Sequence, residues 1–170
     1  MPSIAIVYAT DTGNTRKVAK LLHRRLGSEA ADLFNVAKIE PEVLVEYPLV
    51  LLGTPTLGDG ELPESLEAFL NALEPPHLEK SRIALFGLGD QESYPEEFVD
   101  ALGAVYDRLV ALGGTVVGGG WPVDGYDYEA SRAERDDGFV GLVLDQDNQA
   151  DETEARLDHW LASLDLAVAS

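Results

Sequence analysis

The chain has 170 residues, 45% of them hydrophobic and 25% charged, which predicts one globular domain over residues 1–170 and excludes an intrinsically disordered chain. It contains no cysteine, which excludes disulfides, iron–sulfur clusters and thiol nucleophiles, so any redox chemistry requires a bound cofactor. A formal net charge of −19 argues against nucleic-acid binding, because phosphate backbones are bound by clustered Lys and Arg.

Strands and helices alternate in the first half of the chain. Residues 4–8 form a short apolar run that predicts a buried strand. Apolar residues then recur at helical spacing over 18–26, and Gly27 is expected to end this helix. The elements expected next are a weak strand at 33–36, a short helix at 41–46, a strong strand at 47–52 that ends at Gly53, a helix at 65–73 and a strand at 83–88.

The same alternation continues to the end of the chain. Apolar spacing predicts a helix over 98–112, and the elements expected after it are strands at 115–117 and 139–144 and a helix over 157–164. We interpret the polar residues from about 118 to 138 as an insertion. Because right-handed crossovers place a helix over the sheet after each strand, the pattern predicts an α/β fold with a single doubly wound parallel sheet.

The loop after the first strand has the composition of a phosphate site. Ligands in doubly wound folds bind beyond the carboxyl ends of the strands, where the winding reverses. Residues 10–15 (TDTGNT) combine three hydroxyls, a glycine and the free N–H groups of a helix N-terminus, which favours phosphate binding. The loop lacks the lysine of a P-loop and the glycine spacing of a dinucleotide fingerprint. The alternative is that Thr10 or Thr12 only caps the helix and that Gly13 only turns the chain.

Two further loops are rich in residues that permit sharp turns. Residues 53–63 (GTPTLGDGELP) follow the third strand, and residues 87–95 (GLGDQESYP) follow the fourth. Such loops could hold a planar ring between them, with backbone groups meeting the polar edge of a flavin and Tyr94 offering a flat π surface. The alternative for Tyr94 is a partly buried packing residue.

The three loops together resemble those of the flavodoxin family, and the resemblance covers essentially the whole chain. The Thr-x-Thr-Gly-x-Thr phosphate loop of the family matches residues 10–15, and its two ring-flanking loops match residues 53–63 and 87–95. The interruption between Val117 and Phe139 and the segment LDQDNQADET resemble long-chain members, in which an extra loop splits the fifth strand. The resemblance implies a five-stranded sheet in the order 2-1-3-4-5.

The resemblance also implies a function. It implies a monomeric, low-potential carrier of single electrons that binds FMN non-covalently, cycles mainly between the semiquinone and hydroquinone states, and is not an enzyme. Tyr94 would lie against one face of the flavin and Leu57 against the other, where many long-chain members have Trp and some members associated with nitrogen-fixing bacteria also have Leu. The other cofactor-binding residues that the resemblance implies are Thr10, Asp11, Thr12, Gly13, Asn14, Thr15, Thr54, Pro55, Thr56, Gly58, Asp59, Gly60, Leu88, Gly89, Asp90, Gln91 and Asp147.

No catalytic or metal-ligating residue is expected. His23 and His159 lie on predicted helices and His77 follows two prolines, so we interpret all three as structural or surface residues. Two other classes of protein share the expected fold. An FMN-dependent NAD(P)H quinone reductase would need a nicotinamide pocket. A response-regulator-like module would need an Asp at the end of a central strand, where this chain has Gly53 and Thr54.

Acidic residues are unevenly distributed along the chain. Residues 39–79 and 83–107 contain nine and six acidic residues, respectively, and no Lys or Arg. These acids are interpreted either as a solubilising surface or as a docking face for basic-faced redox proteins. The resemblance implies a reductase as electron donor and a low-potential acceptor such as nitrogenase reductase. The N-terminus lacks a targeting signal and no apolar run could span a bilayer, so we expect a cytoplasmic protein without membrane partners.

Overall fold

The computed structural model describes residues 2–10 and 13–164. Its strands are β1 (Ile4–Tyr8), β2 (Ala31–Asn35), β3 (Leu49–Pro55), β4 (Arg82–Leu88), β5 (Thr115–Val117), β6 (Glu134–Arg135), β7 (Gly138–Phe139) and β8 (Leu142–Leu144). Its α-helices are α1 (Asn14–Leu26), α2 (Glu64–Ala72), α3 (Pro75–Leu78), α4 (Asp100–Ala111) and α5 (Thr153–Ser163). Short 3₁₀ helices cover Val36–Lys38, Pro41–Glu46 and Ala150–Glu152.

The main sheet is parallel and doubly wound, as predicted. Its strands follow the order β2-β1-β3-β4-β5, and β8 also pairs with β4. β5 pairs with the first half of β4 at Arg82–Ala84, and β8 pairs with the second half at Phe86–Leu88. The fifth position of the sheet is therefore shared by two strands, with residues 118–141 inserted between them. The sheet has six strands rather than the expected five because each part of the split position counts as a strand.

The strand predicted at 139–144 is wrong in extent. Phe139 belongs to β7, which pairs antiparallel with β6, and its backbone also bonds to Trp121 in both directions. Only Leu142–Leu144 joins the main sheet. Because the backbone groups of Phe139 already have partners inside the insertion, this residue cannot extend the ladder with β4.

Other boundaries shift by a few residues for local reasons. β3 continues through Pro55, beyond its predicted end at Gly53, because Thr54 and Pro55 still pair with β4. α4 begins at Asp100 rather than at residue 98, because Val99 has a positive φ of 47° and interrupts helical geometry. The predicted helix at 41–46 is present as a 3₁₀ helix.

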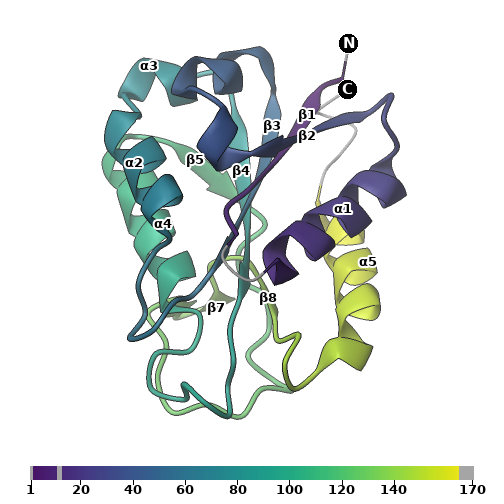
Figure 1. Cartoon of the computed structure of the whole chain (residues 1–170), viewed down its shortest axis with the longest axis vertical. Coiled ribbons are helices and arrows are strands. Elements are labelled where there is room, and N and C mark those ends of the chain that lie inside the picture. Colours follow the sequence, from purple (N-terminus) through teal and green to yellow (C-terminus); the bar gives the residue numbers. More distant parts are fainter. Residues whose placement is uncertain (1, 11–12, 165–170) are drawn as a thin grey trace.

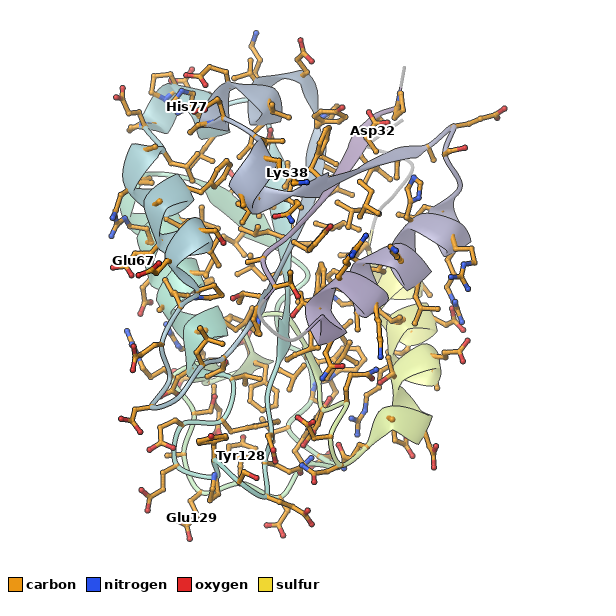
Figure 2. The ribbon with its side chains drawn as sticks, viewed as in Figure 1. Asp32, Lys38, Glu67, His77, Tyr128 and Glu129 are labelled. Carbon is orange, nitrogen blue, oxygen red and sulfur yellow. The ribbon has the colours of Figure 1, made fainter. Side chains whose placement is uncertain are left out.

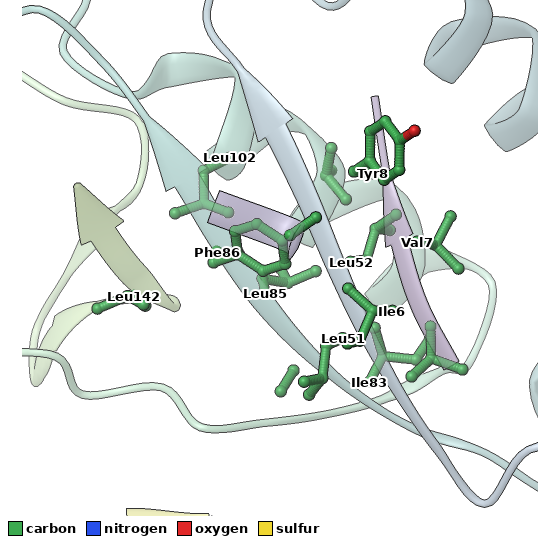
Figure 3. Close-up of a cluster of buried hydrophobic side chains, with 14 of the residues drawn as sticks. Ile6, Val7, Tyr8, Leu51, Leu52, Ile83, Leu85, Phe86, Leu102 and Leu142 are labelled. Atoms are coloured by element: carbon green, nitrogen blue, oxygen red, sulfur yellow. The ribbon is translucent and has the colours of Figure 1, made fainter. Parts of the chain in front are cut away.

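The helices cover both faces of the sheet. Figure 1 shows α1 and α5 on one side and α2, α3 and α4 on the other. β1, β3 and β4 lie between these layers and are buried along nearly their whole length, so their sequences read as continuous apolar runs. Figure 3 shows apolar side chains of these three strands, among them Ile6, Leu51 and Leu85, in one cluster.

The carboxyl ends of the parallel strands lie at one end of the molecule, and the long loops gather there (Figure 1). Figure 2 shows Tyr128 and Glu129 of the insertion at this end, with Asp32 and His77 at the opposite end. The insertion therefore lies beside the loops that follow the strands. None of the described helices is both long and apolar enough to cross a membrane.

Candidate functional site

A cavity of about 250 Å³ lies at the carboxyl ends of the strands. It is formed where the winding of the sheet reverses, between β1 and β3, which is the usual ligand position in doubly wound folds. Four segments contribute to its wall, namely the start of α1 and the loops after β3, β4 and β8. The lining residues are Asn14, Pro55, Thr56, Leu57, Gly58, Leu88, Gly89, Asp90, Tyr94, Gln146 and Asp147.

One end of the site is the N-terminus of α1. Gly13 precedes the helix with a φ of 99°, and its N–H donates to the Thr10 hydroxyl over 3.0 Å. Thr10 therefore stabilises the loop through Gly13, the N-cap residue, and is not itself the N-cap of α1. Thr15 is 1% exposed, and its hydroxyl oxygen is buried without a hydrogen-bond partner among the described residues. Because buried hydroxyls normally have a partner, this oxygen is a candidate contact for a group bound at the start of α1.

The loop after β3 closes into a tight hairpin. Leu57 and Glu61 exchange two backbone hydrogen bonds, of 2.9 and 2.7 Å, and the N–H of Gly60 donates to the Leu57 carbonyl over 2.9 Å. Gly58 and Gly60 adopt positive φ values of 43° and 100°, which glycine enters almost freely. The hairpin holds Leu57 and Gly58 in the cavity wall, while Thr56 accepts a hydrogen bond from the N–H of Ala101 over 3.3 Å.

The loop after β4 presents Tyr94 to the cavity. The Tyr94 N–H donates to the Asp90 carbonyl over 2.8 Å, and the Ser93 N–H donates to the Asp90 carboxylate over 3.0 Å. These bonds fix the backbone, yet the Tyr94 side chain remains 42% exposed. Tyr94 is therefore not a core packing residue, and its ring is accessible to a ligand in the cavity.

The insertion packs against this second loop. The N–H groups of Glu129 and Ala130 both donate to the Pro95 carbonyl, and the Phe98 N–H donates back to the Ala130 carbonyl. The ring centroids of Phe98 and Tyr128 are 5.2 Å apart. The insertion also contacts β8 through Tyr126. The hydroxyl of Tyr126 accepts a hydrogen bond from the Trp121 indole and donates one to the Val143 carbonyl. The aromatic residues of the insertion thus pack internally and support the loop that carries Tyr94.

The structure separates the expected site residues into three groups. Those that line the cavity are Asn14, Pro55, Thr56, Leu57, Gly58, Leu88, Gly89, Asp90, Tyr94 and Asp147. Those in the same loops that do not line it are Thr10, Gly13, Thr15, Thr54, Asp59, Gly60 and Gln91. Asp11 and Thr12 lie outside the described residues.

Sequence reasoning missed two residues at the site. Gln146 lines the cavity, and Asp145, just before it, is buried at the end of β8 and bonded to several loop residues. The only sequence signal for Asp145 is a carboxylate directly after the apolar run Leu142–Leu144. That pattern does not reveal the partners of the carboxylate.

Charge differs between the two ends of the site. α1 carries five of the chain's 12 Lys and Arg residues and no acidic residue, and two of these five, Arg16 and Lys17, directly follow Thr15. At the other end, burial tends to raise the pKa of Asp90, but hydrogen bonds from Ser93 and Asn148 outweigh it and lower this pKa. Desolvation, followed by the charges of Asp90 and Asp145, raises the pKa of Asp147. Asp90 and Asp147 therefore place acidic groups in the cavity wall formed by the loops after β4 and β8.

The fold and the site together define a class of protein. A doubly wound parallel sheet with a helix N-terminus and an open cavity at its point of reversal is typical of α/β proteins that bind a phosphate-bearing cofactor. A family model described as flavodoxin matches residues 6–160 of the chain. The chain belongs to the flavodoxin family.

Individual relatives agree with this assignment over nearly the full length. The chain is 46% identical over 172 residues to a flavodoxin from Klebsiella pneumoniae, covering 96% of this chain and 97% of the relative. It is 41% identical to flavodoxin 1 from Escherichia coli, covering 96% and 93% of the two chains. The crystal structure of Fusobacterium nucleatum flavodoxin bound to flavin mononucleotide matches with a TM-score of 0.86 at 32% identity, covering 95% and 96%.

Proposed function

We propose that the protein binds one FMN non-covalently and carries single electrons between larger redox proteins, as an electron-transfer protein rather than an enzyme. One observation carries this proposal: Asn14, from the first turn of α1, lines the same cavity as Leu57 and Tyr94. The proposed phosphate loop and the two proposed ring-flanking loops therefore contribute to one cavity. Membership of the flavodoxin family favours this function over the quinone-reductase and response-regulator alternatives.

The phosphate of FMN fits the N-terminus of α1. The first-turn N–H groups of a helix have no partner within the helix, and the buried hydroxyl of Thr15 lacks one among the described residues. The first turn of α1 contains no acidic residue, so no side chain there would repel a dianion. Thr10, Asp11, Thr12, Gly13 and Asn14 complete the proposed phosphate loop. A loop that wraps a terminal phosphate leaves no room for an adenylate extension, so we propose FMN and not FAD.

The flavin ring fits between the two loops that carry Leu57 and Tyr94. Tyr94 would stack on one face, while Leu57 would give apolar contact without aromatic stacking on the other. Backbone groups of Gly58, Gly89 and Asp90 lie in the same wall and can meet the polar edge of the ring. The remaining proposed contacts, which support or extend these loops, are Thr54, Pro55, Thr56, Asp59, Gly60, Leu88, Gln91 and Asp147.

FMN supplies the one-electron chemistry when it is bound. The residues around the cavity determine how well added negative charge is tolerated there. Asp59, Glu61, Asp90 and Asp147 all belong to the loops around the ring end of the cavity. A charge about 10 Å from the ring opposes an added electron by about 1.7 kcal/mol at an effective dielectric constant of about 20. Several such charges make the protein a strong reductant.

Flavodoxins exchange electrons with redox partner proteins. The charge of the chain is the basis on which we propose what kind of partner this protein has. The acidic stretches 39–79 and 83–107 include both ring-flanking loops, so they favour partners with a basic face. A reductase donor and a low-potential acceptor such as nitrogenase reductase fit this description. We further propose that residues 1–170 form a single FMN-binding domain that acts as a cytoplasmic monomer.

Electron transfer to a basic acceptor is expected to slow with rising ionic strength. The reduced holoprotein would be mixed with cytochrome c, a basic redox protein, across a salt series. We expect the second-order rate constant to fall about tenfold between about 0.05 and 0.5 M salt, because steering by the acidic loops is screened. A neutral quinone serves as the control acceptor, and its rate should change little. Equal salt dependence for both acceptors would assign the acidic residues to solubility alone.

A further inference from the structure

Asp145 is a fully buried carboxylate that the proposed function does not use directly. It follows β8 and accepts five N–H groups from three residues. Its Oδ2 atom accepts from the backbone N–H of Gln91 at 3.0 Å, from Gln91 Nε2 at 2.7 Å and from Asn148 Nδ2 at 2.9 Å. Its Oδ1 atom accepts from the backbone N–H groups of Asp147 at 3.1 Å and Asn148 at 3.0 Å. Within residues 2–10 and 13–164, no Lys or Arg forms an ion pair with it.

These donors come from two loops that line the cavity. Gln91 lies next to Asp90 in the loop after β4, and Asp147 belongs to the loop after β8. The network extends further, because Asn148 Nδ2 also donates to the Asp90 carboxylate over 2.9 Å. The Gln91 side-chain oxygen accepts the backbone N–H of Asp127, in the insertion, over 2.5 Å. One carboxylate thus joins both loops at the ring end of the site, with Gln91 extending the connection to the insertion.

We propose that Asp145 is a positioning residue that fixes the ring-binding end of the cavity. It holds Gln91 and residues 147–148 in place, and through them it places Asp90 and Asp147 in the cavity wall. This inference rests on the proposed binding of FMN. Asp145 itself does not line the cavity, so it acts through the loops and not by contact with the flavin.

Only a carboxylate can satisfy this arrangement. Asp145→Asn preserves the size of the side chain but replaces one acceptor oxygen with an NH2 group. If the NH2 group takes the place of Oδ2, both donors of Gln91 and the side chain of Asn148 lose their acceptor. If it takes the place of Oδ1, the N–H groups of Asp147 and Asn148 lose theirs. In either orientation the buried NH2 group faces N–H groups that need an acceptor, and this displaces at least one of the two loops.

The test compares FMN with riboflavin, which shares the flavin ring but lacks the phosphate. Dissociation constants of the apoprotein would be measured by quenching of flavin fluorescence, together with the absorption spectrum of the bound flavin. Asp145→Asn is expected to weaken both ligands by a similar factor of about ten, equal to about 1.4 kcal/mol, and to change the spectrum. The matched control Thr15→Val removes a hydroxyl from the phosphate end. It should weaken FMN and leave riboflavin unchanged.

Exchanging the amide and the carboxylate between positions 91 and 145 tests whether Asp145 acts on flavin binding through Gln91. Gln91→Glu alone sets a second carboxylate against Asp145 and should also weaken riboflavin. In the double variant Gln91→Glu/Asp145→Asn, the new amide at position 145 can donate to the new carboxylate at position 91. Riboflavin should then bind more tightly than to either single variant. A double variant that is weaker than both single variants would overturn the role assigned to Gln91 and, with it, the proposal.

Two outcomes separate this inference from the proposed function. If Asp145→Asn lowers the melting temperature but leaves both dissociation constants and the spectrum unchanged, Asp145 supports stability alone and the inference is wrong. If the wild-type protein binds neither flavin, the proposed function itself fails. Should Asp145→Asn not fold, Asn148→Ala removes a single exposed side chain from the network. It should weaken riboflavin several-fold, and an unchanged value would overturn the inference.

Discussion

Replacing Tyr94 with alanine is expected to weaken FMN binding by about 1–3 kcal/mol, or roughly five- to 150-fold in the dissociation constant. The side chain is 42% exposed and stands in the cavity wall, so a bound flavin would cover apolar surface that alanine cannot offer. The loop itself should persist, because the Tyr94 N–H bonds to the Asp90 carbonyl whatever the side chain. Fluorescence titration of the apoprotein with FMN measures the effect.

Tyr94→Phe is the matched control for this prediction. It keeps the ring and removes only the hydroxyl, so the affinity for FMN should remain close to that of the parent. If Tyr94→Ala and Tyr94→Phe both bind FMN as the parent does, Tyr94 is not the stacking ring. If both lose the same affinity, the hydroxyl and not the ring carries the interaction.

Replacing Gly60 with alanine is expected to destabilise the hairpin after β3 and to weaken FMN binding by about 2 kcal/mol or more. Gly60 has a φ of 100°, where a residue with a Cβ is strained. A Cβ at this position would also lie 2.8 Å from the Cβ of Asp100 and 2.9 Å from its Oδ2 atom. The hairpin must then move away from the start of α4, and Leu57 and Gly58 would move with it.

Gly113→Ala separates backbone strain from the steric effect. Gly113 also has a positive φ, of 82°, but a Cβ there would meet nothing within 4 Å, and the residue lies outside the cavity wall. This variant should lose about 1 kcal/mol of unfolding free energy through strain and bind FMN normally. Thermal unfolding and FMN titration of both variants give the comparison. Equal FMN affinities in the two variants would show that the Gly60 hairpin does not shape the site.

The parallel sheet and the loops that line the cavity at its carboxyl ends were predictable because they depend on patterns local in the sequence. Apolar runs mark β1, β3 and β4, since these strands are buried on both faces. The alternation of strands with helices predicts a parallel sheet, and the resemblance to the flavodoxin family implies the strand order that fixes where the winding reverses. The glycines and hydroxyls of the loops at that point favoured a ligand site, and the resemblance to the flavodoxin family implied the places of Leu57 and Tyr94 in it. Leu57 and Tyr94 were expected there, and the structure brings both into one cavity.

The features that sequence reasoning missed depend on contacts between distant residues. Asp145 meets Gln91, 54 positions away in the sequence, and nothing in the order of residues connects the two. Phe139 looks like part of a strand of the main sheet, but its backbone finds partners inside the insertion. The interpretation of residues 118–138 as a polar insertion likewise missed that Tyr128 packs against Phe98 and supports the second ring-flanking loop.

The central claim, that this chain carries FMN, is tested most directly by identifying the cofactor of the purified protein. The protein would be expressed in its full length, its absorption spectrum recorded, and the cofactor released with acid and analysed by mass spectrometry. We predict a yellow protein that releases one FMN per chain. Release of FAD, or a protein that stays colourless after incubation with FMN, would contradict the account.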